Sequence, residues 1–98
     1  NMGLVKATLP DHLAYQKKME AAGSLVMAGP ISDDTGEEMQ AEGMIIYRAA
    51  NLDAARTMAD GDPMHAVGAR SYDIRKWLIN EGSLSFSIAL SSQSVSIG

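Results

Sequence analysis

The chain has 98 residues, a length that suits one domain with its own hydrophobic core. Hydrophobic residues make up 46% of the chain, which disfavours intrinsic disorder. The chain has no cysteine, which excludes a disulfide scaffold, a thiol nucleophile and a cysteine-based zinc site. The formal net charge of −4 disfavours nucleic acid as a partner, because an acidic surface repels phosphate groups.

No apolar run approaches the roughly 20 residues that a membrane-spanning helix needs. The N-terminus also lacks the charged and then apolar pattern of a signal peptide. We therefore expect no membrane partner and a soluble, cytoplasmic protein. A single domain is expected over residues 1–98, with residues 84–98 as an extra C-terminal strand and tail.

A first helix is predicted over residues 11–22, which are rich in good helix formers. Pro10 fits the first helical position, and Gly23 is typical of a helix end. His12 and Tyr15 are three residues apart, so they are expected on one face of this helix.

Two strands are predicted next. Residues 24–28 indicate a short buried strand that Gly29 and Pro30 break. After an acidic turn, residues 40–48 indicate a second strand whose centre is apolar on both faces. A strand of this kind usually has something packed on each side, so the second face is expected to be covered.

Asn51 is a favourable N-cap for a helix over residues 52–59. Asp62 is expected to cap a second, short helical turn, with Pro63 at its first position and Gly68 at its end.

The last part of the chain predicts two more strands, over residues 71–79 and 84–90, the latter half-buried because apolar and small residues alternate in it. The order is then helix, strand, strand, helix, strand, strand. This order predicts an α+β fold of the ferredoxin-like type, with an antiparallel sheet, helices on one face and the first strand absent. The uncovered face of such a sheet favours a symmetric homodimer.

Two histidines are the only side chains that titrate near neutral pH without perturbation. A histidine becomes a good general base when a carboxylate fixes its tautomer and stabilises the imidazolium. Asp62 is placed to do this either for His65, three residues further on, or for His12 across the fold. The spacing leaves both pairings open, and a helix-face histidine and a helix cap are simpler explanations of each residue.

A metal site is not expected. The acidic residues Asp33, Asp34, Glu37 and Glu38 show no ligand spacing relative to the histidines, and this run is typical of a solvated turn. The chain also lacks the glycine-rich loops that bind nucleotides. We therefore expect a function without a cofactor.

Several short segments between Pro10 and Gln93 follow an order and spacing that resemble a known family. They are residues 11–15, 28–30, 33–36, 52–56, 61–63 with Gly68, 75–77 and 80–82. In this order they are similar to the YCII-related family of the dimeric α+β barrel superfamily. The resemblance implies a ferredoxin-like protomer, a barrel-like dimer and a His-Asp dyad at a pocket, which maps onto His12 and Asp62.

Two features depart from the family pattern. Family members begin with a strand before the first helix, whereas here Asn1 stands where the turn after that strand would finish. Family members also often carry an arginine just before the helix histidine, where this chain has Leu9. The departure at Leu9 puts an anion contact from that position in doubt.

The activity known within the family is dehydrochlorination of a chlorinated hydroxyquinol in aromatic degradation, and the related muconolactone isomerases act on ring-cleavage lactones. The resemblance thus implies a cofactor-free lyase for a small aromatic or ring-derived substrate. His12 would take a proton from a ring hydroxyl and Asp62 would orient His12. Tyr15, Ser32 and His65 are the candidates for contacts with ring oxygens.

Two other functions fit the same scaffold. One is a non-catalytic module that binds a small ligand or another protein, and it predicts no turnover. The other is a cofactor-free monooxygenase, which oxygen consumption would reveal.

Overall fold

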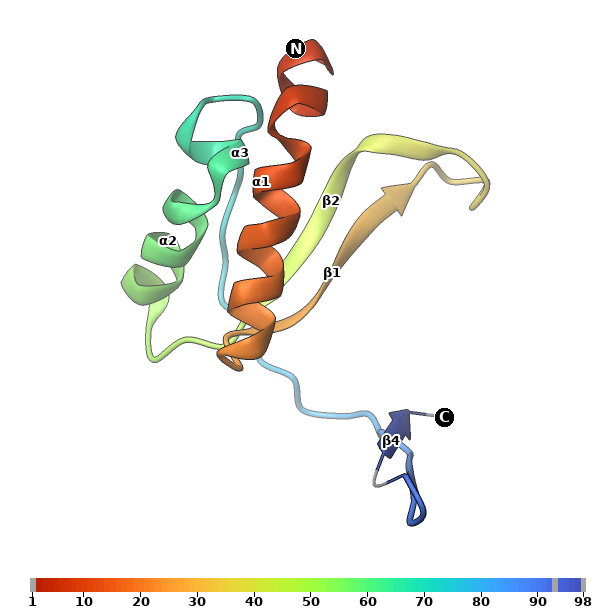
Figure 1. Cartoon of the computed structure of the whole chain (residues 1–98). Coiled ribbons are helices and arrows are strands. Elements are labelled where there is room, and N and C mark those ends of the chain that lie inside the picture. Colours follow the sequence, from red (N-terminus) through yellow and green to blue (C-terminus); the bar gives the residue numbers. More distant parts are fainter. Residues whose placement is uncertain (1, 93, 98) are drawn as a thin grey trace.

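The computed structural model describes residues 2–92 and 94–97. The elements, in order, are α1 (Met2–Ala21), β1 (Leu25–Ser32), β2 (Met39–Tyr47), α2 (Leu52–Gly61), α3 (Pro63–Ala66), β3 (Phe86–Ala89) and β4 (Ser94–Ile97). The helices lie on one side of the β1–β2 hairpin, and β3 and β4 lie apart from both (Figure 1). The predicted α+β class is confirmed, and the arrangement is consistent with a ferredoxin-like fold.

The first helix is longer than predicted. It begins at Met2 and passes through Pro10, so the expectation that Pro10 marks its start is wrong. A proline inside a helix removes one backbone hydrogen bond and costs about 3 kcal/mol. Packing offsets this cost, because Val5 is buried in a cluster with Met64 and Ala69 that the added turns bring to the core.

Strand β1 continues to Ser32 through the residues that were expected to break it. Pro30 is tolerated in β1 for two reasons. Among the described strands only β2 pairs with β1, so Pro30 lies in an edge strand, and the pairing of the two strands is already irregular between Pro30 and Ser32. The two strands approach closely here, since a Cβ on Gly43 would lie 2.9 Å from the carbonyl oxygen of Gly29. Glycine at position 43 allows this approach.

The strand predicted over residues 40–48 forms as β2, but its second face is not covered within this chain, since Met44 is 54% exposed. The predicted helix caps are confirmed. The Asn51 side chain accepts a hydrogen bond of 2.8 Å from the backbone N–H of Ala54 and begins α2. The Asp62 carboxylate accepts one of 2.9 Å from the N–H of Met64 and begins α3. Gly68 follows with a φ of +74°, a conformation that favours glycine.

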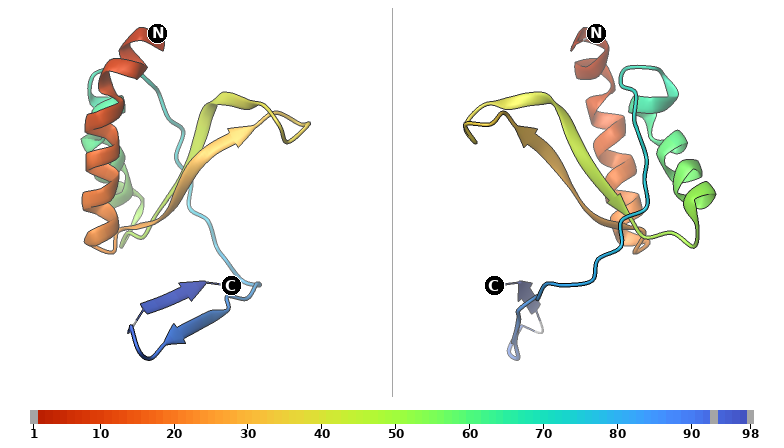
Figure 2. Two further views of the ribbon diagram at one scale, coloured as in Figure 1. Left: turned by 45° about the vertical axis from the view of Figure 1, so that its right-hand side comes forward. Right: turned by 180° about the vertical axis from the view of Figure 1, so that it is seen from behind.

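The strand predicted over residues 71–79 is wrong, because this described segment has no strand pairing. Seen from behind, it passes between β2 and α2 and then leaves the body of the molecule (Figure 2). Its residues are compatible with a strand, but a ladder also needs a partner, and among the described strands β2 pairs with β1 alone.

The strand predicted over residues 84–90 forms as the shorter β3, which pairs antiparallel with β4. The described strands therefore make two separate two-stranded sheets rather than one. The prediction that this strand is half-buried is wrong. Phe86 is 60% exposed and Ile88 is 64% exposed, because neither the helices nor the β1–β2 hairpin covers β3.

Candidate functional site

The clearest candidate site joins His12 of α1 to Asp62, which lies between α2 and α3. The Nδ1 atom of His12 is 2.8 Å from each carboxylate oxygen of Asp62. The Asp62 side chain is fully buried and 17% of the His12 side chain is exposed. The structure thus brings together the two residues that the family resemblance pairs, and the alternative pairing of Asp62 with His65 is wrong.

The hydrogen bonds fix the tautomer of His12. A carboxylate can only accept, so the proton between the two groups belongs to Nδ1. Asp62 also accepts from the N–H of Met64, so its buried charge meets two donors. The lone pair of neutral His12 is then on Nε2, for which the described residues provide no hydrogen-bond partner. Nε2 is the atom of this pair that can take a proton from another molecule.

The packing of α1 against α3 explains why the pair forms. Val5 contacts the cluster around Met64, which anchors the first half of α1 on α3. His12 follows Val5 by seven residues and therefore lies two turns along the same face. Asp62 precedes Met64 by two residues, so the same packing sets the carboxylate near that face.

Tyr15 lies next to this pair but is engaged within the fold. Its hydroxyl donates a hydrogen bond of 2.7 Å to the carbonyl oxygen of Met58 in α2. Burial raises the pKa of the Tyr15 hydroxyl, and the charge of Asp62 raises it further. This hydrogen bond ties α1 to α2 beside Asp62, and the contact between Tyr15 and a ring oxygen stays a prediction.

Tyr47 is a residue that the sequence analysis did not assign to the site. Its hydroxyl is buried and has no hydrogen-bond partner among the described residues. Burial raises the pKa of this hydroxyl to about 12, with further contributions from the charges of Asp62 and Tyr15. Alternation along β2 could have shown that Tyr47 shares a face with Ile45. It could not have shown that this face meets the dyad.

The other two candidates lie apart from the dyad. His65 directs its Nδ1 to the carbonyl oxygen of Ala59 at 2.7 Å, and its ring packs at 4.7 Å from that of Tyr72. The hydroxyl of Ser32 donates a hydrogen bond of 2.8 Å to the carbonyl oxygen of Asp33 at the end of β1. The structure gives both side chains local partners, and neither is brought to His12.

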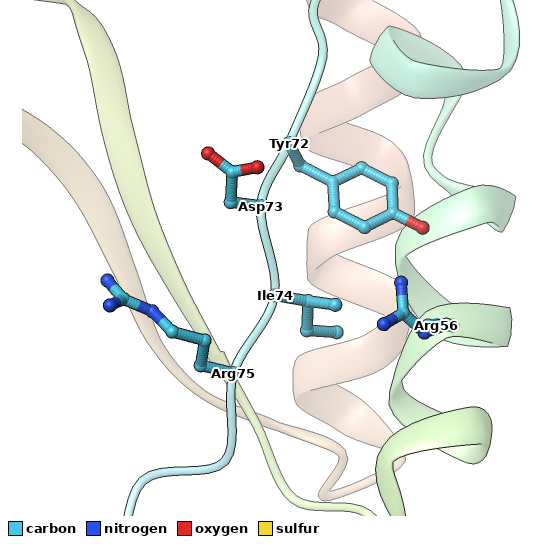
Figure 3. A pocket seen from close by; sticks show the side chains of 5 residues that line it. All are labelled: Arg56, Tyr72, Asp73, Ile74 and Arg75. Carbon is cyan, nitrogen blue, oxygen red and sulfur yellow. The ribbon is translucent and has the colours of Figure 1, made fainter.

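Two open cavities lie near the site without including it. One of about 470 Å³ is lined by Arg56, Tyr72, Asp73, Ile74 and Arg75 (Figure 3). In that view Tyr72 and Ile74 point toward α2, whereas Arg75 points toward the hairpin. The other, of about 600 Å³, lies between α1 and β1. Neither is lined by His12 or Asp62, so these two cavities do not supply the pocket expected beside the dyad.

Across residues 2–92 and 94–97, no three histidine or acidic side chains gather closely enough to hold a metal ion. Within the same residues, no helix combines the length and the apolar character needed to cross a membrane.

Comparison with known proteins identifies the family of this chain. Residues 4–78 match the model of the YCII-related domain, and the chain belongs to this family. It is also similar to the uncharacterized protein YjpA of Bacillus subtilis (strain 168), with 29% identity over 70 residues that cover 71% of this chain and 75% of YjpA. No solved structure matches the chain. The resemblance seen in the sequence is thus confirmed at the level of the family.

Proposed function

We propose that the protein is a cofactor-free lyase that acts on a small oxygenated ring compound through His12 and Asp62. One observation carries this proposal: Nδ1 of His12 is held at 2.8 Å from both oxygens of a fully buried carboxylate, while Nε2 has no partner among the described residues. This is the arrangement of a general base whose orienting group is in place.

His12 and Asp62 have different roles in the proposed reaction. Nε2 of His12 takes a proton from the substrate, and the imidazolium that forms is stabilised by the Asp62 carboxylate. The carboxylate itself keeps its charge, because it still accepts from Met64 and from His12. A positioned acid or base of this kind contributes about 10²- to 10⁴-fold to a rate.

A chlorinated hydroxyquinol is the substrate that we propose. His12 removes the proton of a ring hydroxyl, and the ring shifts to its keto form as a proton is added to the carbon that bears chlorine. Loss of a second hydroxyl proton then expels chloride and gives a quinone. The sum is the loss of HCl, so the reaction requires neither an oxidant nor a reductant.

We also propose that the working form is a homodimer. Single chains leave the dyad outside both cavities, and they leave large apolar side chains of β1 and β2 exposed, including Met27 at 58% and Met44 at 54%. A second copy would cover such a surface.

Chloride release from a panel of chlorinated hydroxyquinols and lactones tests the lyase. The wild-type chain is expected to release chloride and the His12→Ala variant to lose at least about 100-fold in rate. Asp60→Asn is the matched control, because Asp60 is a neighbouring carboxylate that binds Tyr72 rather than His12. An active His12→Ala variant would contradict the mechanism.

The cavities favour one alternative, a module that binds a small ligand without turnover. The cavity between α1 and β1 is large enough for a small molecule and is lined by both apolar and charged side chains, among them Leu13, Lys17 and Val26. This function predicts no chloride release from any compound in the panel. It also predicts that a bound compound raises the melting temperature equally in wild type and in His12→Ala.

A further inference from the structure

The hydroxyl of Tyr47 is buried and unpaired. Among the described residues, its oxygen is the only buried side-chain nitrogen or oxygen atom without a hydrogen-bond partner. An unpaired buried donor destabilises a fold, so the protein keeps this hydroxyl at a loss of stability. Groups of this kind are rare in folded proteins and are found where function requires them.

The hydroxyl lies beside the dyad. Tyr47 is the last residue of β2, and that end of the strand lies beside the second half of α1, which carries His12 and Tyr15 (Figures 1 and 2). Tyr47 is paired with Leu25 of β1, the strand that α1 contacts. Asp62 is close enough for its charge to raise the pKa of the Tyr47 hydroxyl. Strand β2 thus brings a hydroxyl to the dyad from the side opposite to α2.

The Tyr47 hydroxyl has a proton to donate, whereas its neighbours have already given theirs. The hydroxyl of Tyr15 donates to the carbonyl oxygen of Met58. The Nδ1–H of His12 donates to Asp62. Burial raises the pKa of Tyr47 to about 12, so this hydroxyl keeps its proton near neutral pH. It is therefore a donor that waits for an acceptor from another molecule.

The lyase chemistry requires a donor for the ring oxygen that loses its proton. When His12 takes that proton, negative charge develops on the oxygen. A donor that is already in place stabilises this charge without reorganisation, and its effect is largest where water is excluded. A buried hydroxyl without a partner meets both conditions.

We propose that Tyr47 is a substrate-binding residue whose hydroxyl donates a hydrogen bond to the ring oxygen that His12 deprotonates. The bound molecule is then a phenol held as its anion between two donors, the imidazolium of His12 and the hydroxyl of Tyr47. Tyr47 is partly exposed although its hydroxyl is buried, so a ligand enters along its ring. This role rests on the proposed lyase function, because it concerns the same site.

Binding of 4-nitrocatechol tests the role of Tyr47 without turnover. The compound has two ring hydroxyls and no chlorine, and its visible absorption shifts when a hydroxyl ionises. The wild-type chain is expected to bind it as the anion at a pH where the free compound is largely neutral. Tyr47→Phe is expected to raise the dissociation constant at least about tenfold, because a hydrogen bond to a charged oxygen is lost. The pH at which the bound compound ionises should also rise in this variant.

Three controls separate a binding role from a structural one. Tyr72→Phe removes the same atom from a tyrosine whose hydroxyl binds Asp60, so it should bind the compound as wild type does. His12→Ala should abolish the spectral shift, because the base is absent. The melting temperature of Tyr47→Phe should not fall below that of wild type, since the lost hydroxyl has no partner to leave unpaired.

A wild-type chain that does not bind 4-nitrocatechol would overturn the proposal. Equal affinity and equal ionisation of the bound compound in wild type and in Tyr47→Phe would overturn it as well. Failure of the lyase gives a different result: binding that depends on Tyr47, with no chloride release from the chlorinated panel, would support the role of this hydroxyl and contradict the reaction.

Discussion

The side chain of Tyr15 occupies the space that any residue larger than glycine would need at position 61. A Cβ on Gly61 would lie 2.8 Å from the Tyr15 hydroxyl. From this position the hydroxyl reaches the carbonyl oxygen of Met58, and Asp62 follows Gly61 directly. The contact between Tyr15 and Gly61 therefore sets how closely α1 approaches the carboxylate that His12 binds.

Gly61→Ala should push Tyr15 away from α2 and lower the free energy of unfolding by about 1–3 kcal/mol. Urea unfolding measures this change. Because the nearest atom is the hydroxyl, Tyr15→Phe combined with Gly61→Ala should lose less stability than the sum of the two single variants. Strict additivity in this double-mutant cycle would contradict the contact.

Asp62→Ala should be strongly destabilising, by about 3 kcal/mol, because it leaves the N–H of Met64 and the Nδ1–H of His12 without their shared acceptor. Asp60→Ala is the matched control, since its exposed hydrogen bond to Tyr72 is worth about 1 kcal/mol or less. Guanidinium unfolding of the two variants measures the difference. Equal losses would show that the buried carboxylate has no special role in the fold.

Pro10→Ala distinguishes the observed helix from the one that the sequence predicts. Within α1, alanine restores a backbone hydrogen bond, so the variant should gain about 1–3 kcal/mol and melt at a higher temperature. If the helix instead began at Pro10, alanine would bring no gain there, because proline suits a first position. Thermal unfolding followed at 222 nm decides between these outcomes.

The raised pKa of Tyr47 predicts how the free energy of unfolding changes at high pH. Its pKa is raised from 10.0 to about 12 in the folded protein, so the folded state holds this proton more tightly than the unfolded state. The stability that depends on the neutral hydroxyl is complete below pH 10 and is lost as the pH rises from 10 toward about 12.

Urea unfolding at about pH 9 and about pH 11.5 measures this loss. Tyr47→Phe has no proton to lose at this position, so its stability should fall less than that of wild type over the same interval. Near neutral pH the variant should be about 1 kcal/mol more stable, because it removes a buried hydroxyl without a partner. An identical pH dependence in both proteins would contradict this account.

Local signals in the sequence predicted the parts of the fold that depend on local chemistry. The cap at Asn51, the cap at Asp62 and the turn at Gly68 were all predictable, because each depends on hydrogen bonds or backbone angles within a few residues. The hairpin of β1 and β2 and the helix α2 followed from periodicity for the same reason.

The errors arose where distant residues decide the structure. The start of α1 depends on Val5 packing against Met64, and residues 71–79 remain without a ladder because no described strand pairs with them. The pairing of His12 with Asp62 required the family resemblance, because 50 positions separate them. The place of Tyr47 beside the dyad depends on how β2 faces the helices, which no local pattern encodes.

Because Asp62 binds two groups, the backbone amide of Met64 can report on the state of the site. The Asp62 carboxylate holds the backbone N–H of Met64 and the ring of His12 at the same time. The rate at which deuterium replaces the hydrogen on that amide therefore follows the position of the carboxylate. A ligand that draws His12 and Asp62 together should slow this exchange, and one that separates them should speed it, so a single peptide proton records what happens at the imidazole.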